Sequence, residues 1–332
     1  MVEHSRQALV GAIGGTYISL AIADIDELTI ANFALLNSAD FTDPMQAIER
    51  YLKSVPRCPN KVGIAVAGTV DGDSAKLTYR PWTITKNDVR ATTGADHVHL
   101  VNDFEAMALM LPHLSSYDLV PLSEGDKALH ANKIVLYSGT GLGVAGIVHD
   151  GAHWVAIRGE AGGMAFPTPP AKEFDLKLLF PGKDFVSVSD VFSGRGLVAL
   201  YEALAKSKGE TPRVSGARRI SEAGLGNEDA TATEALNLIA TWLGRFAGDM
   251  AMVYGARGGV YLTGGFAANI IPILTNGRFM DAFENKGGSA AWLKQVPVNI
   301  IKTAADAGLR GAALALAESL PVRPAATRKA GR

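Results

Sequence analysis

One acidic residue, Asp103, stands where an apolar stretch gives way to a helical pattern. Val98–Val101 has the character of a buried strand, Asn102 and Asp103 follow directly, and the apolar residues beyond them recur at helical spacing. In open α/β sheets this strand-to-helix junction is where reactive groups meet a crevice. An ionised carboxylate there could accept the proton of a substrate hydroxyl. The position suits a helix N-cap equally well, so position alone leaves both roles open.

Short glycine turns are a second candidate for chemistry. Gly139–Gly143 lies between two apolar stretches, so its backbone N–H groups could wrap phosphate oxygens. Gly141–Gly146 also fits G-x-G-x-x-G, with Glu160 near the distance of a ribose-binding acid, but a dinucleotide site needs a helix directly after the glycines. The residues after Gly143 have the pattern of a strand, which disfavours that interpretation. No G-x-x-x-x-G-K-[ST] phosphate loop occurs in the sequence.

Glu160 and Gly264–Gly265 are two further candidates. Glu160 lies in a glycine-flanked loop, where a carboxylate can accept hydrogen bonds from sugar hydroxyls, although a solvated loop acid fits equally well. Gly264–Gly265 follows a short apolar strand and could let a nucleotide approach the backbone, or form an ordinary strand-to-helix turn. The sequence has no H-E-x-x-H motif, no G-x-S-x-G elbow and no histidine spacing typical of a metal site, so we predict no metal-ligating residues.

Composition narrows the class of protein. The chain has 332 residues, of which 48% are hydrophobic and 20% charged, enough apolar side chains for a large core. Its net charge is −1, which argues against a protein whose whole surface binds nucleic acid or an anionic membrane. The single cysteine, Cys58, excludes an internal disulfide framework and fits a reducing cytoplasm. We expect no signal peptide and no membrane span, because the apolar runs are short.

Two segments of the chain resemble each other. Leu9–Asp24 and Ile134–Asp150 each consist of an apolar strand, a turn rich in glycine and threonine, and a second apolar strand, which predicts two β-hairpins of one design. Strand and helix patterns alternate elsewhere, which indicates an α/β protein with mixed sheets and two related domains. We expect further strands near 28–36, 62–67, 98–101, 153–157 and 260–262, and helices near 44–55, 104–111, 196–206, 231–253 and 306–320.

The order and spacing of several motifs resemble the bacterial hexokinase-like glucokinase family. The resemblance runs from about Leu9 to Leu320, and its markers are Gly14-Gly15-Thr16, Pro81-Trp82, Val101-Asn102-Asp103-Phe104, Gly139-Thr140-Gly141-Leu142-Gly143-Val144, Gly159-Glu160, Ser193-Gly194-Arg195-Gly196-Leu197, Gly244-Arg245-Phe246, Gly264-Gly265 and Phe283-Glu284-Asn285-Lys286-Gly287. It implies two ribonuclease H-like domains of the actin/hexokinase type facing across a cleft. The smaller domain would comprise 1–112 with 303–320, the larger 113–302, and 321–332 would be a disordered basic tail.

The resemblance also implies a function. The family transfers a phosphoryl group from ATP, with Mg²⁺, to the 6-hydroxyl of glucose. We therefore expect a cytoplasmic protein that forms a homodimer and has no nucleic-acid or membrane partner. Asp103 would be the catalytic base, and Asn102, Asp103 and Glu160 would bind the sugar. The nucleotide would bind to residues in three turns, namely Gly14, Gly15, Thr16, Gly139, Thr140, Gly141, Gly143, Gly264 and Gly265.

The chain departs from the family pattern at five cleft positions. The family has an aspartate that helps to hold magnesium where this chain has Ala12, a sugar-contacting histidine at Gly163 and a sugar-binding glutamate at Ser189; asparagine is usual at Tyr17 and Tyr79. Two hypotheses follow. One is a hexose kinase with altered activity or sugar preference; the other is a degenerate, non-catalytic protein that binds sugar or nucleotide on the same scaffold. Loss of the metal-holding carboxylate favours the second, and the retained Asp103 favours the first.

Overall fold

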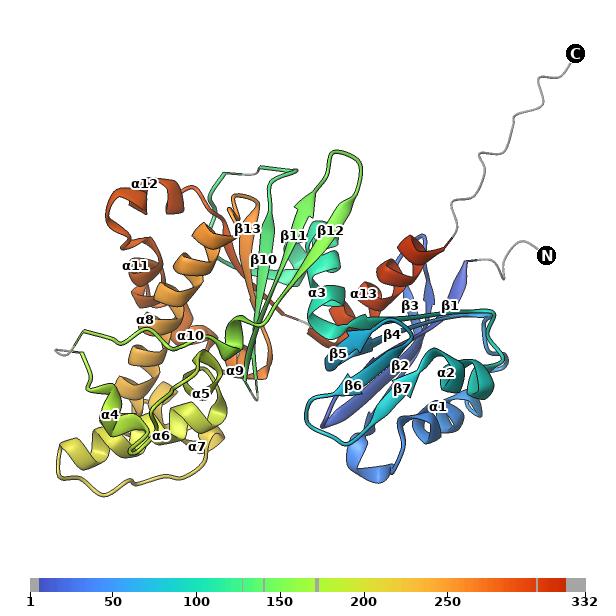
Figure 1. Ribbon diagram of the computed structural model, residues 1–332. Coiled ribbons are helices and arrows are strands. Elements are labelled where there is room, and N and C mark those ends of the chain that lie inside the picture. The colour runs from blue at the N-terminus through green and yellow to red at the C-terminus, as the bar shows by residue number, and fades with distance from the viewer. Residues whose placement is uncertain (1–5, 127, 140, 171–172, 303, 321–332) are drawn as a thin grey trace, which may run out of the picture. The chain divides into compact units, whose positions relative to one another are not determined.

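A computed structural model describes residues 6–126, 128–139, 141–170, 173–302 and 304–320 and forms two compact units, one of Met1–Ala106 with Ala305–Arg332 and one of Met107–Ala304 (Figure 1). We call them unit 1 and unit 2. The predicted tail at 321–332 and one proposed site residue, Thr140, lie outside the described residues.

Unit 1 is built on a five-stranded sheet in the order β3-β2-β1-β4-β8. β1 is antiparallel to β2 and parallel to β4, which is parallel to β8. A smaller antiparallel sheet, β5-β6-β7, follows β4 along the chain. The strands are β1 (Gln7–Ile13), β2 (Tyr17–Asp24), β3 (Ile30–Asn37), β4 (Lys61–Val66), β5 (Gly68–Asp71), β6 (Ser74–Leu77), β7 (Thr83–Thr85) and β8 (His97–Asn102).

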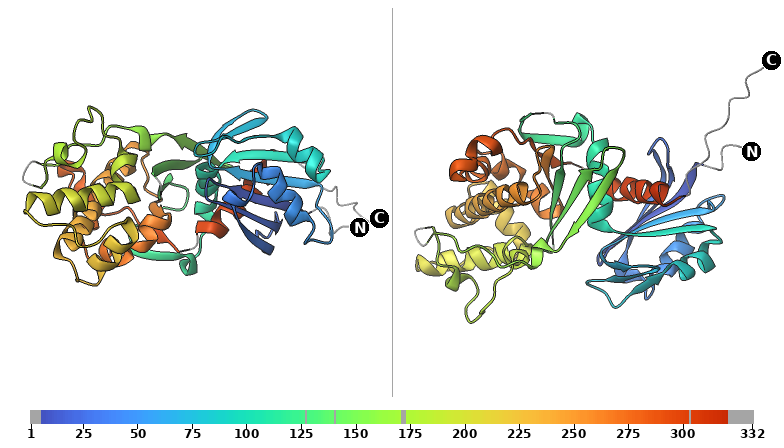
Figure 2. Two further views of the ribbon diagram at one scale, coloured as in Figure 1. Left: turned by 90° about the horizontal axis from the view of Figure 1, so that it is seen from below. Right: turned by 45° about the horizontal axis from the view of Figure 1, so that its top comes forward.

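Helices cover both faces of the main sheet of unit 1. On one face α1 packs through Ile48 and Tyr51 onto a buried apolar cluster of the sheet. Its start follows local rules, since Asp43 caps it by accepting a hydrogen bond from the Met45 N–H and Pro44 takes the first helical position. On the other face α13 approaches β4 closely (Figure 2). The helices of unit 1 are α1 (Pro44–Leu52), α2 (Lys86–Thr93) and most of α13 (Ala304–Ser319); α3 (Asp103–Met110) begins in unit 1, and a 3₁₀ turn lies at Ser38–Asp40.

Unit 2 repeats the same sheet design and adds one strand. Its order is β12-β11-β10-β13-β14-β9, so a three-stranded antiparallel part again adjoins two parallel strands, and β9 pairs antiparallel at the edge. The strands are β9 (Leu119–Ser123), β10 (Lys133–Ser138), β11 (Leu142–His149), β12 (Trp154–Gly159), β13 (Gly259–Thr263) and β14 (Val298–Ile301).

The long helix α8 organises the core of unit 2. Its residues Leu236, Leu243 and Phe246 are buried in one apolar cluster with Ile134 and Leu262 of the sheet. The helices are α4 (Leu176–Leu179), α5 (Val188–Val191), α6 (Gly194–Ser207), α7 (Ala217–Leu225), α8 (Ala230–Val253), α9 (Gly265–Asn269), α10 (Ile271–Leu274), α11 (Arg278–Glu284) and α12 (Ala290–Leu293). Single 3₁₀ turns lie at Leu111–His113, Ser116–Asp118, Ala161–Gly163 and Gly287–Ser289.

The two predicted hairpins are confirmed as β1–β2 and β10–β11, and the mixed α/β fold is confirmed as two sheets with a common strand order. The sequence did not predict the small sheet β5-β6-β7 or the edge strand β9. These strands are short, and a run of three to five residues carries little periodicity.

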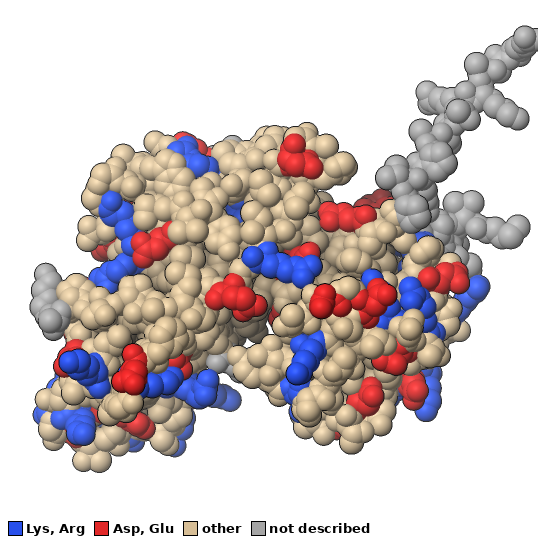
Figure 3. All heavy atoms as spheres, viewed as in Figure 1, with Lys and Arg blue, Asp and Glu red and all other residues tan. Residues whose placement is uncertain are grey.

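The surface carries both signs of charge. On the face drawn in Figure 3, basic and acidic side chains are interspersed, with no broad area of one sign. Among the described residues, no helix is both long and apolar enough to cross a membrane.

A glycine in α8 sets how closely this helix approaches α11. A Cβ added to Gly244 would lie 2.1 Å from the carbonyl oxygen of Phe279. We predict that Gly244→Ala lowers the free energy of unfolding by about 1–3 kcal/mol, because overpacking outweighs the better helix propensity of alanine. Urea denaturation measures the change. Gly288→Ala, where a Cβ meets no atom within 4 Å, is the matched control; an equal change in both variants would contradict the packing argument.

Candidate active site

The side chain of Asn102 ties together the end of β8 and the start of α3. Its Oδ1 accepts hydrogen bonds from the backbone N–H groups of Phe104 (3.0 Å) and Glu105 (3.2 Å), so Asn102 caps the helix. Its Nδ2 donates to the carbonyl of Gly68 (2.8 Å) and to Oδ1 of Asp103 (3.1 Å). The N-cap role that the sequence left open for Asp103 therefore belongs to its neighbour.

Asp103 is the first residue of α3 and is half-buried. The Asn102 amide has two N–H donors, and one of them holds the Asp103 carboxylate while the other is anchored on Gly68. Both N–H donors and the carbonyl oxygen of Asn102 are engaged within the protein, and one of these bonds reaches the Asp103 carboxylate; the sugar-binding role predicted for Asn102 stays a prediction. Acidic residues in the first turn of a helix are also favoured by the helix dipole.

The turn Gly14–Thr16 lies at the same edge of the sheet as Asp103. Ile13, Val66 and Asn102 share one row of the parallel strands β1, β4 and β8, so both groups follow the carboxyl ends of these strands. Within the described chain no hydrogen-bond acceptor is assigned to the N–H groups of Gly15 and Thr16. These N–H groups remain available to an anion.

Two side chains that the sequence did not single out fix this turn. The Ser38 hydroxyl donates to the carbonyl of Gly14 (2.9 Å), and Arg80 Nε donates to the carbonyl of Gly15 (2.7 Å). The Arg80 guanidinium also lies over the Trp82 ring, 4.8 Å from its centroid. A Cβ on Gly15 would lie 3.2 Å from Cβ of Tyr79, so the segment with Tyr79 packs directly on the turn. Arginine and serine far apart in sequence carry no local pattern that would have revealed these contacts.

In unit 2, a glycine brings the ends of two strands together. Tyr137 of β10 pairs with Thr263 of β13, and the turns after both strands share one edge of the sheet. Gly264 has φ +99° there, and a Cβ on it would lie 2.3 Å from the carbonyl oxygen of Ser138. Only glycine, which has no Cβ, lets the backbone at position 264 lie this close to Ser138. The buried hydroxyl of Thr263 has no hydrogen-bond partner among the described residues, so this hydroxyl could still form a hydrogen bond at this edge of the sheet.

Hydrogen bonds from Ser189 hold the end of the turn after β10. The Ser189 hydroxyl accepts from the N–H of Leu142 (3.0 Å) and donates to the carbonyl of Leu142 (3.1 Å), where β11 begins. A Cβ on Gly162 would lie 1.8 Å from the Leu142 carbonyl oxygen and 2.5 Å from the Ser189 hydroxyl. Ser189, where the resemblance predicts a sugar-binding glutamate in the family, is therefore hydrogen-bonded to the backbone of the turn.

Glu160 follows β12 and is exposed, with no side-chain hydrogen bond or ion pair to another described residue. A Cβ on the neighbouring Gly163 meets no atom within 4 Å. The loop around Glu160 thus has room for a ligand or for a larger side chain.

The proposed residues fall into two sets, one in each unit. Unit 1 holds Gly14, Gly15, Thr16, Asn102 and Asp103, and unit 2 holds Gly139, Gly141, Gly143, Glu160, Gly264 and Gly265. The dinucleotide interpretation of Gly141–Gly146, which the sequence already disfavoured, is excluded, because Leu142–His149 forms strand β11 and no helix starts at these glycines.

Comparisons with known proteins identify the family. A family model described as Glucokinase matches residues 9–319. The chain belongs to the glucokinase family. It is similar to the glucokinase of Mesorhizobium japonicum (36% identity over 299 residues, 88% of this chain and 86% of that protein) and to that of a Chelativorans species (37% identity over 298 residues, 88% and 86%). A crystal structure of glucokinase from an Antarctic psychrotroph matches with a TM-score of 0.84 and 30% identity, covering 95% of this chain and 99% of that one.

Membership of the glucokinase family makes this chain an ATP-dependent hexose kinase with the two-domain actin/hexokinase fold, as the resemblance implied. Neither the family match nor these relatives favour the alternative of a degenerate binding protein.

The two hydrogen bonds between the Ser189 hydroxyl and the Leu142 backbone should stabilise the fold. Ser189→Ala removes both hydrogen bonds to Leu142, whose side chain is buried, and we expect the free energy of unfolding to fall by about 1–3 kcal/mol. Faster hydrogen exchange of the Leu142 amide would locate the effect. Ser207→Ala, which removes one bond near a helix end, is the control. Unchanged exchange at Leu142 would refute the anchoring role.

Proposed function

We propose that this protein phosphorylates the 6-hydroxyl of glucose or a closely related hexose, with Asp103 as the base. The observation that carries the proposal is the carboxylate of Asp103, which is fixed by Asn102 at the carboxyl end of β8. A base must be held within hydrogen-bond reach of the hydroxyl whose proton it takes, and the bond from Asn102 Nδ2 to Asp103 Oδ1 supports this role. Glu160, which is exposed and has no side-chain partner among the described residues, would accept hydrogen bonds from sugar hydroxyls.

The nucleotide would lie against the glycine turns. In phosphoryl transfer the protein contributes mainly position and charge stabilisation. In unit 1, the N–H groups of Gly15 and Thr16 would donate hydrogen bonds to phosphate oxygens. In unit 2, the nucleotide would be bordered by Gly139, Thr140, Gly141, Gly143, Gly264 and Gly265. We propose the domains as 1–112 with 303–320 and 113–302.

The residues that the structure describes do not form a resident magnesium site. Ala12 stands at the position of the family's metal-holding aspartate, and the described residues include no group of three or more His, Cys, Asp or Glu side chains that could hold a metal ion. Magnesium is often bound through substrate phosphates with one or two carboxylates. We therefore treat the ion as part of the Mg–ATP substrate. The homodimer and the cytoplasmic location stay predictions.

An assay of ADP release tests the proposal. The protein is supplied with Mg–ATP and a panel of hexoses, and Asp103→Ala is run beside it. We expect hexose-dependent ADP release that falls by at least about 10²-fold in Asp103→Ala, because the base is lost. Asp71→Ala, which removes an exposed carboxylate of unit 1, should retain normal turnover. ADP release without a hexose requirement, or full turnover in Asp103→Ala, would contradict the proposal.

The open space at Gly163 gives a second prediction. The family has a sugar-contacting histidine there, and a Cβ added to Gly163 meets no atom within 4 Å. We expect Gly163→His to lower the KM for glucose about 3- to 10-fold, the value of one added hydrogen bond, without loss of thermal stability. Gly288→His, at an equally open position, should leave KM unchanged. An unchanged KM in Gly163→His would place the sugar elsewhere.

A further inference from the structure

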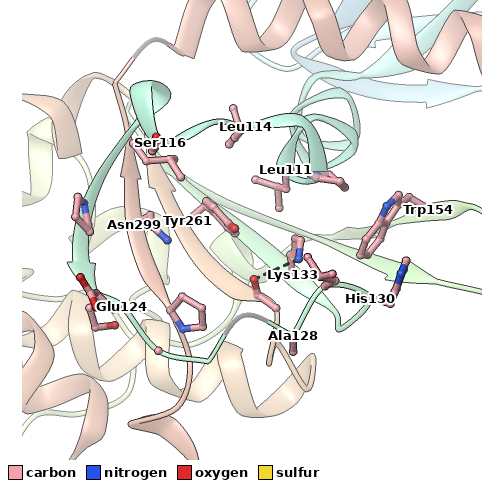
Figure 4. A pocket seen from close by; sticks show the side chains of 18 residues that line it. Leu111, Leu114, Ser116, Glu124, Ala128, His130, Lys133, Trp154, Tyr261 and Asn299 are labelled. Carbon is pink, nitrogen blue, oxygen red and sulfur yellow. Dashed lines mark hydrogen bonds between the residues drawn. The ribbon is translucent and has the colours of Figure 1, made fainter.

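Unit 2 contains a cavity of about 750 Å³ (Figure 4). It lies where the parallel strands begin: Lys133 is the first residue of β10, Gly258 precedes β13 and Pro297 precedes β14. The proposed nucleotide turns follow the other ends of β10 and β13. The cavity is therefore separate from the candidate active site, and no residue proposed for catalysis or for substrate binding lines it.

Three polar side chains from neighbouring strands form its floor. Tyr261 and Asn299 pair directly in the sheet, and Lys133 pairs with Gly259, two residues before Tyr261 on the same face. Two glycines make room for them. A Cβ on Gly258 would lie 2.8 Å from Nζ of Lys133, and a Cβ on Gly259 would lie 3.0 Å from the Tyr261 ring.

The ammonium group of Lys133 lacks a counter-ion among the described residues. Lys133 is 8% exposed; its Nζ donates one hydrogen bond, to the carbonyl of Gly258 (3.3 Å), and lies 5.2 Å from the centroid of Trp154. An ammonium has three donors, so two remain. Burial lowers the pKa of Lys133, which reflects the cost of leaving this charge in the protein without a partner. Glu124, the one carboxylate among the described residues that line the cavity, is exposed and makes no ion pair with Lys133.

The remaining surroundings combine free polar groups with an apolar wall. The Tyr261 hydroxyl and the Asn299 amide make no side-chain hydrogen bond to another described residue. Figure 4 places Lys133 between this pair and the rings of His130 and Trp154. These two rings are stacked, with an interplanar angle of 19°, and the other lining is mostly apolar, including Leu111, Leu114 and Leu119.

We propose that this cavity binds a small carboxylate with an apolar or aromatic body. The carboxylate would accept hydrogen bonds from Lys133, Tyr261 and Asn299, and the body would pack against Trp154. A charge-assisted bond to an ammonium is among the stronger hydrogen bonds, and buried charges in proteins are normally paired. One ammonium with two neutral donors matches a single negative charge better than the nearly double charge of a phosphate. The volume is typical of a small-molecule site.

Calorimetric titration of the full chain tests the proposal. The probes are benzoate and 3-phenylpropanoate, their neutral amides, and inorganic phosphate. We expect the two carboxylates to bind saturably, and the amides and phosphate to bind at least about tenfold more weakly. Lys133→Met, which keeps the apolar stem, should weaken carboxylate binding at least about tenfold. Lys61→Met is the matched control, since Lys61 is also buried at the start of a strand but lies in unit 1.

A measurement on the unaltered protein gives an independent result. In a spectrum of ¹⁵N-labelled tryptophan indoles, benzoate should shift the signal of Trp154 and leave that of Trp82 in place. Equal binding of acid and amide, tighter binding of phosphate, undiminished binding by Lys133→Met, or an unmoved Trp154 signal would each overturn the proposal.

Discussion

The amide of Asn102 is the contact on which the arrangement in unit 1 depends. Four hydrogen bonds from one side chain cap α3, fasten the strand end to Gly68 and hold the carboxylate of Asp103. An N-cap of this kind stabilises a helix by about 0.5–2 kcal/mol, and here the same side chain also orients the proposed base. Position 68 accepts only glycine, because a Cβ there would lie 2.0 Å from the carbonyl oxygen of Lys76. The stability of α3 and the orientation of the proposed base thus depend on one residue.

Both units use the same solution to place their functional groups. Each sheet has a hairpin beside two parallel strands, and the proposed residues follow the carboxyl ends of these strands. In unit 1 the turn at Gly14–Thr16 is fixed by Ser38 and Arg80, and in unit 2 the turn after β10 is fixed by Ser189. Glycine at 264 lets the two strand ends of unit 2 approach each other. The backbone therefore forms the turns proposed to bind phosphate, and the side chains of Ser38, Arg80 and Ser189 fix these turns by hydrogen bonds.

Much of this arrangement could be predicted from the sequence because it depends on local patterns. Alternating apolar runs around glycine turns predicted both hairpins, and the strand-to-helix junction pointed to Asp103. The division of roles between Asn102 and Asp103 could not be predicted, because either side chain can cap a helix. The contacts of Ser38, Arg80 and Ser189 join residues distant in the chain. The resemblance predicts that Ser189 replaces a sugar-binding glutamate, and nothing in the sequence indicated that its hydroxyl is also bonded to the backbone of Leu142.

We propose that Asn102 acts on turnover through Asp103, and a double-mutant cycle tests this coupling most directly. Turnover of a hexose is measured for the unaltered protein, Asn102→Ser, Asp103→Ala and the double variant; serine keeps a capping oxygen but has no amide to hold the carboxylate. If Asn102 positions Asp103, the effects are not additive, and the double variant is no slower than Asp103→Ala. Fully additive losses would show that Asn102 contributes to turnover independently of Asp103 and would contradict the account.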